Sequence, residues 1–330
     1  MTKLIHLSDI HFGANDPPPD RALVTAVPER LGGVMDSDVP SNDGPTIDGP
    51  TIDGFDLDQF VERVLAEDLG HGGDVTSRAT IDRDVRFAAT MNCREPIVVA
   101  GLDLAIAFFR TLDRDVVIER PVRDGDAVAA GTVLLRLDGN ARAMLAAERS
   151  ALNTLQHLSG IATLTRTYAD AIAGCHARLL DTRKTIPGLR ALAKYAARMG
   201  GADNHRMRMD DGLLIKDNHV AVCGSVGAAV RRARAADIGL MVQVEVDRIE
   251  QIDEALAAGA DRLLLDNMTP DILRAAVAKV AGRVPCEASG GVRLDTIRAI
   301  ADSGVDYVSV GRITQSAPAV DIGLDYALQG

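Results

Sequence analysis

Short apolar runs alternate with amphipathic, helix-like stretches along the second half of the chain. The runs occupy residues 178–180, 213–215, 242–244, 263–265, 284–286 and 307–310. Repeated strand, helix, strand units are typical of α/β proteins with a parallel sheet. The even spacing of the runs favours a sheet that closes into a barrel over an open sheet.

The globular sequence before these repeats has a different pattern, in which single helices alternate with strand-like segments. Residues 55–70 have apolar positions at helical spacing and end at Gly70, a suitable C-cap. Strands are predicted at residues 86–92 and 97–100, a helix at 102–112, and a strand, turn, strand segment at 116–138 with turns at Gly125 and Gly131. This pattern predicts a small α+β domain.

A long helix is predicted to join the two domains. Asn140 is a suitable N-cap, and the helical spacing that follows is expected to break near Gly160 and to resume as far as Ala173. The predicted division is an extension at residues 1–55, a smaller α/β domain at 56–150, a barrel domain at 151–315 and a C-terminal segment at 316–330.

The first 55 residues differ in composition from the rest of the chain. They hold seven of the thirteen prolines, nine acidic against three basic residues, and a tandem repeat at residues 44–53. We expect this low-complexity extension to be disordered. Its opening, KLIHLSDIHFG, resembles the start of calcineurin-like metallophosphoesterases, in which Asp9 and His11 would bind a metal. No later segment supplies the further ligands of such a site, so we interpret the pair as a relic or fusion scar.

Composition limits the classes of function. The net charge is -11, the sequence pI is about 5.1, and aromatic residues make up 3% of the chain, with no Trp. An acidic surface with few aromatic side chains disfavours nucleic acid or an anionic membrane as a partner. No apolar run approaches the length of a membrane span, and the N-terminus does not have the pattern of a secretory signal, so we expect a cytoplasmic protein.

The four cysteines, Cys93, Cys175, Cys223 and Cys286, stand far apart in the sequence. None has the paired CxxC spacing of a zinc site or a redox loop. We expect four buried thiols.

One region reverses the acidic balance of the chain. Between Arg178 and Lys216 there are nine Lys and Arg residues against four Asp, a local charge of +5. At its start the segment DTRKTIPGLR places Arg183 and Lys184 just after an apolar run. This arrangement predicts a loop that binds a small polyanion.

Polar residues follow all six predicted strands. They are Arg183 and Lys184, Lys216 and Asp217, Glu245, Asp266 and Asn267, Glu287 and Ser289, and Gly311. In a parallel barrel the loops at the carboxyl ends of the strands form the active site. Any one of these residues alone is typical of a solvated loop, but the coincidence over six strand ends predicts a single polar cavity.

The residue types suggest which chemical group of a ligand each part of that cavity would bind. A guanidinium group recognises a planar carboxylate with two parallel hydrogen bonds, which suits Arg183 and Arg206 to a carboxylated ring. Lys184 and Lys216 are point charges suited to phosphate, and His205 either donates to a carboxylate or is structural.

The remaining strand ends suggest contacts with a sugar phosphate. Glu245 and Asp266 are suited to ribose hydroxyls or to Mg²⁺. The glycines of the segments EASGGV and SVG, at residues 287–292 and 309–311, allow the backbone to approach a phosphate group. A ligand with carboxylates, ribose and phosphates fits all of these residues.

Eight segments in order carry a family resemblance. They are ERSALNTLQHLSGIAT, DTRKTIPGLR, NHR at residues 204–206, LIKDNH at 214–219, VEVD, LLDNM, EASGGV and SVG. Together they resemble the quinolinate phosphoribosyltransferases, and the resemblance covers nearly everything from Phe55 onward. It implies an incomplete parallel α/β barrel, a smaller N-terminal open-faced α/β sandwich domain, and a homodimer with a shared active site.

The resemblance also implies a reaction and roles for residues. Quinolinate and phosphoribosyl pyrophosphate would give nicotinate mononucleotide, pyrophosphate and CO₂ in NAD biosynthesis, with Mg²⁺ and no organic cofactor. The implied substrate contacts are Arg183, His205 and Arg206 with quinolinate, Arg149 from the neighbouring subunit, Lys184 and Lys216 between carboxylates and phosphates, Glu245 and Asp266 with ribose and metal, and Ser289, Gly290 and Gly311 with the 5'-phosphate. Lys184, Lys216, Glu245 and Asp266 are the implied catalytic residues.

One position departs from the family pattern. Many members have Thr-His-Ser after the last strand, whereas this chain has Thr314, Gln315 and Ser316. A glutamine donates a hydrogen bond but carries no charge, so a phosphate contact there would be weaker and independent of pH.

Two other interpretations remain open beside the metallophosphoesterase one. The chain could belong to the related phosphoribosyltransferase-like proteins associated with molybdenum transport, which act on another substrate. Alternatively, it could be a non-catalytic barrel scaffold. The NHR and LIKDNH segments favour quinolinate, and the presence of all the named basic residues disfavours a scaffold.

Overall fold

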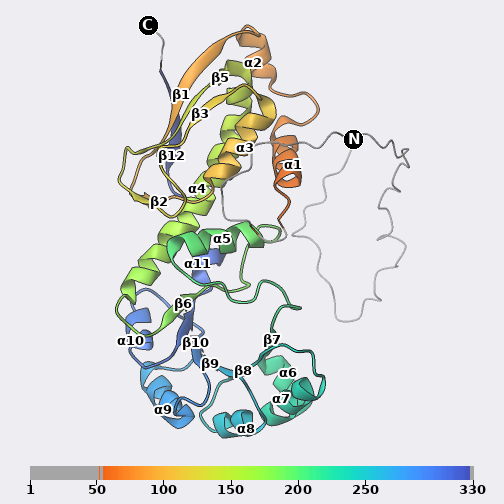
Figure 1. Ribbon diagram of the computed structural model, residues 1–330, viewed down its shortest axis with the longest axis vertical. Helices are drawn as coiled ribbons and strands as arrows, with labels where there is room; N and C mark the ends of the chain where they lie inside the picture. Colours follow the sequence, from red (N-terminus) through yellow and green to blue (C-terminus); the bar gives the residue numbers. More distant parts are fainter. Residues whose placement is uncertain (1–51, 53–54, 328–330) are drawn as a thin grey trace, which may run out of the picture. The chain divides into compact units, whose positions relative to one another are not determined.

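The computed structural model describes Ile52 and residues 55–327. Asp9, His11 and all of the tandem repeat except Ile52 lie outside these residues, as does nearly all of the predicted disordered extension. The described part of the chain consists of an antiparallel sheet with helices, followed by a parallel α/β sheet (Figure 1).

The N-terminal part contains the elements α1 (Leu57–Leu69), α2 (Val75–Thr80), β1 (Arg86–Cys93), β2 (Ile97–Val98), α3 (Leu102–Leu112), β3 (Val117–Glu119), β4 (Ala127–Val128) and β5 (Val133–Asn140). The predicted helices at 55–70 and 102–112 are confirmed as α1 and α3. Helix α1 is capped at its N-terminus by Asp56, whose carboxylate accepts a hydrogen bond of 3.0 Å from Gln59 N, and at its C-terminus by Gly70, which has a φ of 52°. Both ends therefore follow the sequence signals.

Helix α4 (Ala141–Ala171) runs without a break, so the predicted interruption near Gly160 is wrong. Its N-cap is Asn140, as expected, with Oδ1 accepting from Ala143 N at 3.2 Å. Gly160 serves packing instead, because a Cβ atom there would lie only 2.1 Å from the carbonyl oxygen of Pro318. The helix thus contains a glycine because another segment of the chain crosses it at that point.

The crossing segment ends as β12 (Ile322–Ala327), which pairs antiparallel with β1. Two hydrogen bonds hold the approach to this strand against α4: Val320 N donates to Gln156 O at 3.2 Å, and Gln156 Nε2 donates to Ile322 O at 2.7 Å. The resulting sheet has the order β12-β1-β5-β3. The predicted C-terminal segment therefore returns to the N-terminal sheet.

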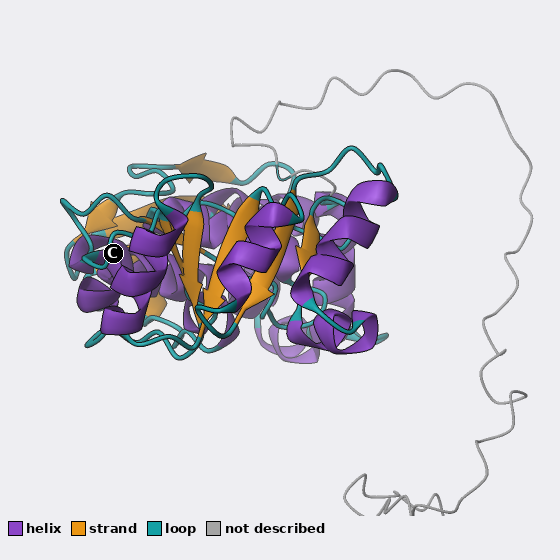
Figure 2. Ribbon diagram, turned by 90° about the horizontal axis from the view of Figure 1, so that it is seen from below, coloured by secondary structure: helices purple, strands orange, loops and turns teal. Residues whose placement is uncertain are grey.

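The second part of the chain is a six-stranded parallel sheet in the order β6-β11-β10-β9-β8-β7. Its strands are β6 (Arg178–Leu180), β7 (Leu213–Ile215), β8 (Val242–Val246), β9 (Arg262–Asp266), β10 (Cys286–Ser289) and β11 (Tyr307–Ser309). The helices are α5 (Arg190–Gly200), α6 (Asp217–Cys223), α7 (Val226–Ala235), α8 (Gln251–Ala257), α9 (Pro270–Val280), α10 (Ile297–Ala301) and α11 (Arg312–Gln315). Helices α7, α8 and α9 lie along the outside of the curved row of strands (Figure 1), and Figure 2 shows helices flanking the strands from another side.

The sheet is open, because β6 and β7 are its two edges and do not pair with each other in the part of the chain that the structure describes. The incomplete barrel is therefore confirmed, and the closed barrel expected from the spacing alone is wrong. In place of a further strand beside β6, the chain forms one isolated bridge between Leu180 and Asp203. An irregular segment thus occupies the edge at which the barrel would close.

Strand β10 begins two residues later than predicted, at Cys286 instead of residue 284. Pro285 precedes it, and proline has no N–H to donate to a ladder. Glu287 therefore lies within the strand and is fully buried, not in the loop beyond it.

The expectation of four buried thiols is half right. Cys93 and Cys286 are buried, whereas Cys175 and Cys223 are partly exposed, and all four are free. None of the helices described combines the length and apolar character needed to cross a bilayer.

Candidate active site

A cavity of about 650 Å³ opens at the carboxyl ends of the parallel strands. Its lining comprises Thr182, Arg183, Lys184, His205, Arg206, Leu214, Lys216, Asp217, Glu245, Leu264, Asp266, Asn267, Glu287, Ser289, Gly290, Gly291, Val292, Ser309, Gly311, Arg312 and Gln315. The strand ends therefore bring together every predicted site residue except Arg149. That residue is exposed on α4 and does not line the cavity.

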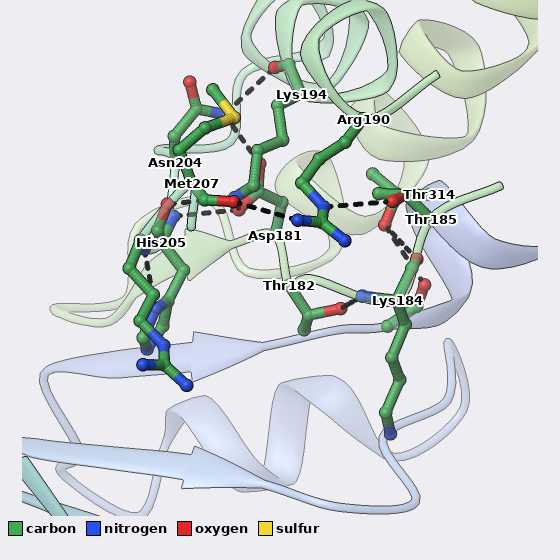
Figure 3. Close-up of polar contacts among 12 residues, drawn as sticks. Asp181, Thr182, Lys184, Thr185, Arg190, Lys194, Asn204, His205, Met207 and Thr314 are labelled. Atoms are coloured by element: carbon green, nitrogen blue, oxygen red, sulfur yellow. Dashed lines mark hydrogen bonds and ion pairs between the residues drawn. The ribbon is translucent and has the colours of Figure 1, made fainter. Parts of the chain in front are cut away.

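A buried ionic cluster supports one wall of the cavity. Asp181 and Lys194 are fully buried and form an ion pair. The carboxylate of Asp181 also accepts from Asn204 Nδ2 at 2.6 Å and from His205 N at 2.8 Å, and Lys194 Nζ donates to His205 O at 2.9 Å. Figure 3 shows these contacts converging on Asp181. The cluster joins β6, α5 and the segment 203–206, which fixes the residues on either side of it.

Burial raises the pKa of Asp181 and lowers the pKa of Lys194, and the attraction between the two charges opposes both shifts. The contacts of Asp181 show that it holds this loop in place. Lys194 is a residue that the sequence analysis did not identify, and the available signal is its place in an apolar helical stretch, because a buried lysine needs an anionic partner.

Arg183 and Arg206 follow members of this cluster in the chain and lie close enough for their like charges to interact. The Nε atoms of both are buried and have no hydrogen-bond partner among the described residues. Burial lowers the pKa of the Arg206 guanidinium, and the charge of Arg183 adds to the effect. Two desolvated cations with unused donors are suited to a ligand with two adjacent carboxylates.

His205 lies between these arginines and the interior of the sheet. Its Nδ1 accepts a hydrogen bond of 2.8 Å from Arg206 N, which assigns the ring proton to Nε2. That nitrogen lies 3.4 Å from Glu287 Oε2 and has no hydrogen bond of good geometry within the described residues. The ring therefore has one donor available at the cavity wall.

Glu287 is the centre of a polar group in the interior of the sheet that the sequence analysis did not predict. Gln243 Nε2 donates to its Oε2 at 2.7 Å, and Arg262 Nη1 lies 3.8 Å from the same oxygen. Burial alone would raise the pKa of Glu287, but the neighbouring His205 ring and the hydrogen bond from Gln243 outweigh burial and lower the pKa. The signal in the sequence was the alternation VQVEV, in which Gln243 and Glu245 point to the same face of a strand.

Glu245 and Asp266 form an acidic pair at the ends of β8 and β9. Burial raises the pKa of both carboxyl groups, and the charge of Asp266 adds to the shift of Glu245. Lys216 opposes the shift at both carboxyl groups. The positive charge of Lys216 therefore only partly offsets the effects of burial on these two carboxyl groups.

Lys184 reaches the cavity through a gap that a glycine leaves open. A Cβ atom on Gly311 would lie 2.8 Å from Lys184 Cδ. The backbone of Lys184 is held by Thr314 Oγ1, which donates to Lys184 O at 2.9 Å. The side chain extends away from the Asp181 cluster (Figure 3). Gly311 therefore provides space for a lysine as well as a backbone close to the cavity.

An open α/β barrel with a cationic, partly acidic cavity at its strand ends is the architecture of an enzyme that binds a small polyanion. Residues 74–159 match the N-terminal domain of quinolinate phosphoribosyl transferase, and residues 161–325 match its C-terminal domain. The chain belongs to this family.

Named relatives and solved structures agree with this assignment. The chain is 45% identical over 271 residues to the nicotinate-nucleotide pyrophosphorylase [carboxylating] of Mycobacterium leprae, covering 80% of this chain and 95% of that protein. It is 41% identical over 263 residues to a probable nicotinate-nucleotide pyrophosphorylase [carboxylating] of Bacillus subtilis, covering 79% and 90%. The structure of the Francisella tularensis nicotinate-nucleotide pyrophosphorylase aligns with a TM-score of 0.80 and 38% identity, over 84% of this chain and 100% of that one.

Proposed function

We propose that the protein transfers the phosphoribosyl group of phosphoribosyl pyrophosphate to quinolinate with decarboxylation. The products are nicotinate mononucleotide, pyrophosphate and CO₂, and the reaction belongs to NAD biosynthesis. The observation that carries the proposal is the pair Arg183 and Arg206 in the cavity wall, whose buried Nε donors are unused among the described residues and suit a ring with two adjacent carboxylates. The names of the relatives support the same reaction.

The residues then have the following roles. Arg183, Arg206 and His205 orient the two carboxylates, and Lys184 and Lys216 stabilise the charge on the departing pyrophosphate. Ser289, Gly290 and Gly311 contact the 5'-phosphate.

Bond changes occur mainly in the substrates. The pyridine nitrogen forms a bond to the anomeric carbon, and the bond from that carbon to pyrophosphate breaks with its electron pair leaving on oxygen. The bond between C2 and the carboxylate then breaks, its electrons remain at C2 beside the cationic nitrogen, and a proton takes the place of CO₂. The protein contributes orientation, restricted water and positive charge.

Glu245 and Asp266 fit a role in holding Mg²⁺ and the ribose. Two carboxylates whose pKa values are raised by burial, with Asp266 adding to the shift of Glu245, are stabilised by a divalent cation between them. The described residues contain no group of three or more His, Cys, Asp or Glu side chains suited to a metal, so oxygens of the donor and water would complete the coordination. Bound there, Mg²⁺ would neutralise charge on the pyrophosphate.

Arg149 belongs to the proposed function as a contribution from a neighbouring subunit in a homodimer. It is exposed on α4 and lies outside the cavity of its own chain. Mixing subunits that carry Arg149→Ala with subunits that carry Lys184→Ala should restore part of the activity, because one of the two sites in a mixed dimer is then intact. Mixed dimers without recovered activity would contradict a shared site.

Gln315 lines the cavity at the phosphate end and is exposed. Its amide offers a neutral donor, so we expect Gln315→His to strengthen binding of the phosphoribosyl donor below about pH 6.5, where an imidazole becomes charged. A dissociation constant for the donor that does not change with pH in this variant would exclude a phosphate contact at residue 315.

The direct test is incubation of the protein with quinolinate, phosphoribosyl pyrophosphate and Mg²⁺, with detection of CO₂ and nicotinate mononucleotide. A folded sample that releases neither would overturn the proposal and favour a non-catalytic scaffold. Turnover of another carboxylated ring in preference to quinolinate would instead favour a transferase with a different substrate. We place the protein in the cytoplasm, a location that fractionation of cells would test.

A further inference from the structure

Asn267 has a left-handed backbone conformation that is uncommon among residues other than glycine. Its φ is 55°, in the left-handed region, directly after the end of β9. Glycine adopts this conformation without steric cost, whereas other residues do so at a cost, asparagine less than most. The asparagine side chain therefore has a use that offsets this cost.

The side chain makes a short contact with its neighbour. Asn267 Nδ2 donates to Asp266 Oδ2 at 2.5 Å, and Asn267 N donates to Ser289 O at 2.9 Å. The first bond engages one oxygen of the carboxylate and limits its rotation. The second ties the end of β9 to the end of β10, so the amide is itself held in place.

Gly290 makes room for this arrangement. A Cβ atom on Gly290 would lie 2.2 Å from Asn267 Oδ1 and 2.6 Å from Cγ of the same side chain. The space beside the backbone of Gly290 is thus filled by the asparagine amide. The backbone at the ends of β9 and β10 therefore accommodates the asparagine side chain that donates to Asp266.

We propose that Asn267 is a positioning residue, which fixes the carboxylate of Asp266 so that its other oxygen meets the ribose and metal of the phosphoribosyl donor. The inference rests on the proposed function and deepens it. In the proposed function the arginines bind the ring with two carboxylates, whereas the Asn267 amide acts on Asp266. The effect of losing it should therefore fall on the donor and not on quinolinate.

Asn267→Gly separates the two roles of this residue. Glycine keeps the left-handed backbone and removes the amide, so a purely conformational role predicts an unchanged enzyme. Positioning predicts a dissociation constant for phosphoribosyl pyrophosphate with Mg²⁺ that rises about tenfold in calorimetric titration, the effect of one hydrogen bond to a charged group. It also predicts a raised KM for the donor and an unchanged KM for quinolinate.

Asn267→Asp gives a second measurement, because aspartate also tolerates the left-handed conformation but repels Asp266. Donor binding should fall further than in the glycine variant. Asn92→Asp is the matched control: Asn92 Nδ2 also donates to a carboxylate, Asp325 Oδ2 at 2.8 Å, in the N-terminal sheet and away from the cavity. That variant should bind the donor as the unaltered protein does.

An Asn267→Gly protein with unaltered donor binding would overturn the proposal, as would an equal rise in the KM of both substrates. Turnover of quinolinate by the unaltered protein tests the proposed function separately. If that turnover is absent, titration of the donor alone into both proteins still decides whether Asn267 acts on Asp266.

Discussion

Two pairs of charged residues beside the cavity have opposite environments. Asp181 and Lys194 are fully buried and form an ion pair with each other. Arg183 lies two residues beyond Asp181, Arg206 lies in the segment 203–206 that Asp181 holds, and the buried Nε atom of each has no hydrogen-bond partner among the described residues. A buried charge that is paired belongs to the scaffold, and one that is not paired awaits a ligand. Partnering, more than burial, separates structural from functional charges around this cavity.

Lys194→Met should give the largest change in stability. It leaves the Asp181 carboxylate buried without its cation, which costs about 3–5 kcal/mol of the free energy of unfolding. Urea denaturation monitored by circular dichroism would measure the loss. The double variant Asp181→Asn with Lys194→Met should recover part of it, and a single variant within about 1 kcal/mol of the unaltered protein would show that the pair is not a scaffold.

Arg183→Ala should leave stability nearly unchanged and weaken quinolinate binding. Loss of charge-assisted hydrogen bonds corresponds to about 2–3 kcal/mol, or roughly 30- to 150-fold in kcat/KM for quinolinate. Arg208→Ala is the control, because Arg208 is exposed and forms an ion pair with the nearby Asp210, and neither residue lines the cavity. Near-normal kinetics in the Arg183 variant would remove this residue from the substrate site.

Glu287→Gln addresses a charge of intermediate character: one carboxylate oxygen is held by Gln243, and the other has no hydrogen-bond partner in the part of the chain that the structure describes. The pKa of Glu287 is lowered in the folded protein, so its contribution to stability is present above the unfolded value near 4.5 and is lost as the pH falls through the folded value. We expect the variant to lose about 1–2 kcal/mol at pH 7 and to match the unaltered protein in acid. A difference that is constant with pH would exclude an ionised Glu287.

Lys279→Ala should have the smallest effect. Lys279 forms an ion pair of 3.0 Å with Asp253, whose side chain is 65% exposed. Pairs in such surroundings contribute at most about 1 kcal/mol. Thermal unfolding in low and high salt would measure the contribution of the pair to stability. A loss of stability as large as that of Lys194→Met would mean that solvent exposure does not determine how much an ion pair contributes.

Much of the fold could be predicted from the sequence, because local patterns determine it. Strand β6, strand β7 and helix α3 have the predicted bounds, since apolar runs and caps mark them directly. The continuity of α4 and the open edge of the sheet were not predictable in this way. Gly160 predicts a break in the helix unless the segment that crosses it, which includes Pro318, is known. The bridge between Leu180 and Asp203 depends on a contact between residues that are distant in sequence.

The candidate site shows the same division. Polar residues that directly follow an apolar run were identified, and the structure brings them to one cavity. Polar residues within the strands were harder to place: Gln243 was not identified, and Glu287 was expected in the loop after its strand. An interior-facing side chain in a short apolar run has no distinguishing local signal. The role of Asn267 depends on a backbone angle, which the sequence does not display.

The return of the last strand to the first sheet has a consequence during synthesis on the ribosome. Strand β1 pairs with β12, and its Asn92 bonds Asp325, a residue 233 positions later in the chain. Until the end of the chain leaves the exit tunnel, one edge of β1 has unpaired backbone groups that another polypeptide can match. The nascent protein is therefore most exposed to aggregation when nearly all of it has already been made, and removal of residues 322–327 should make that vulnerability permanent.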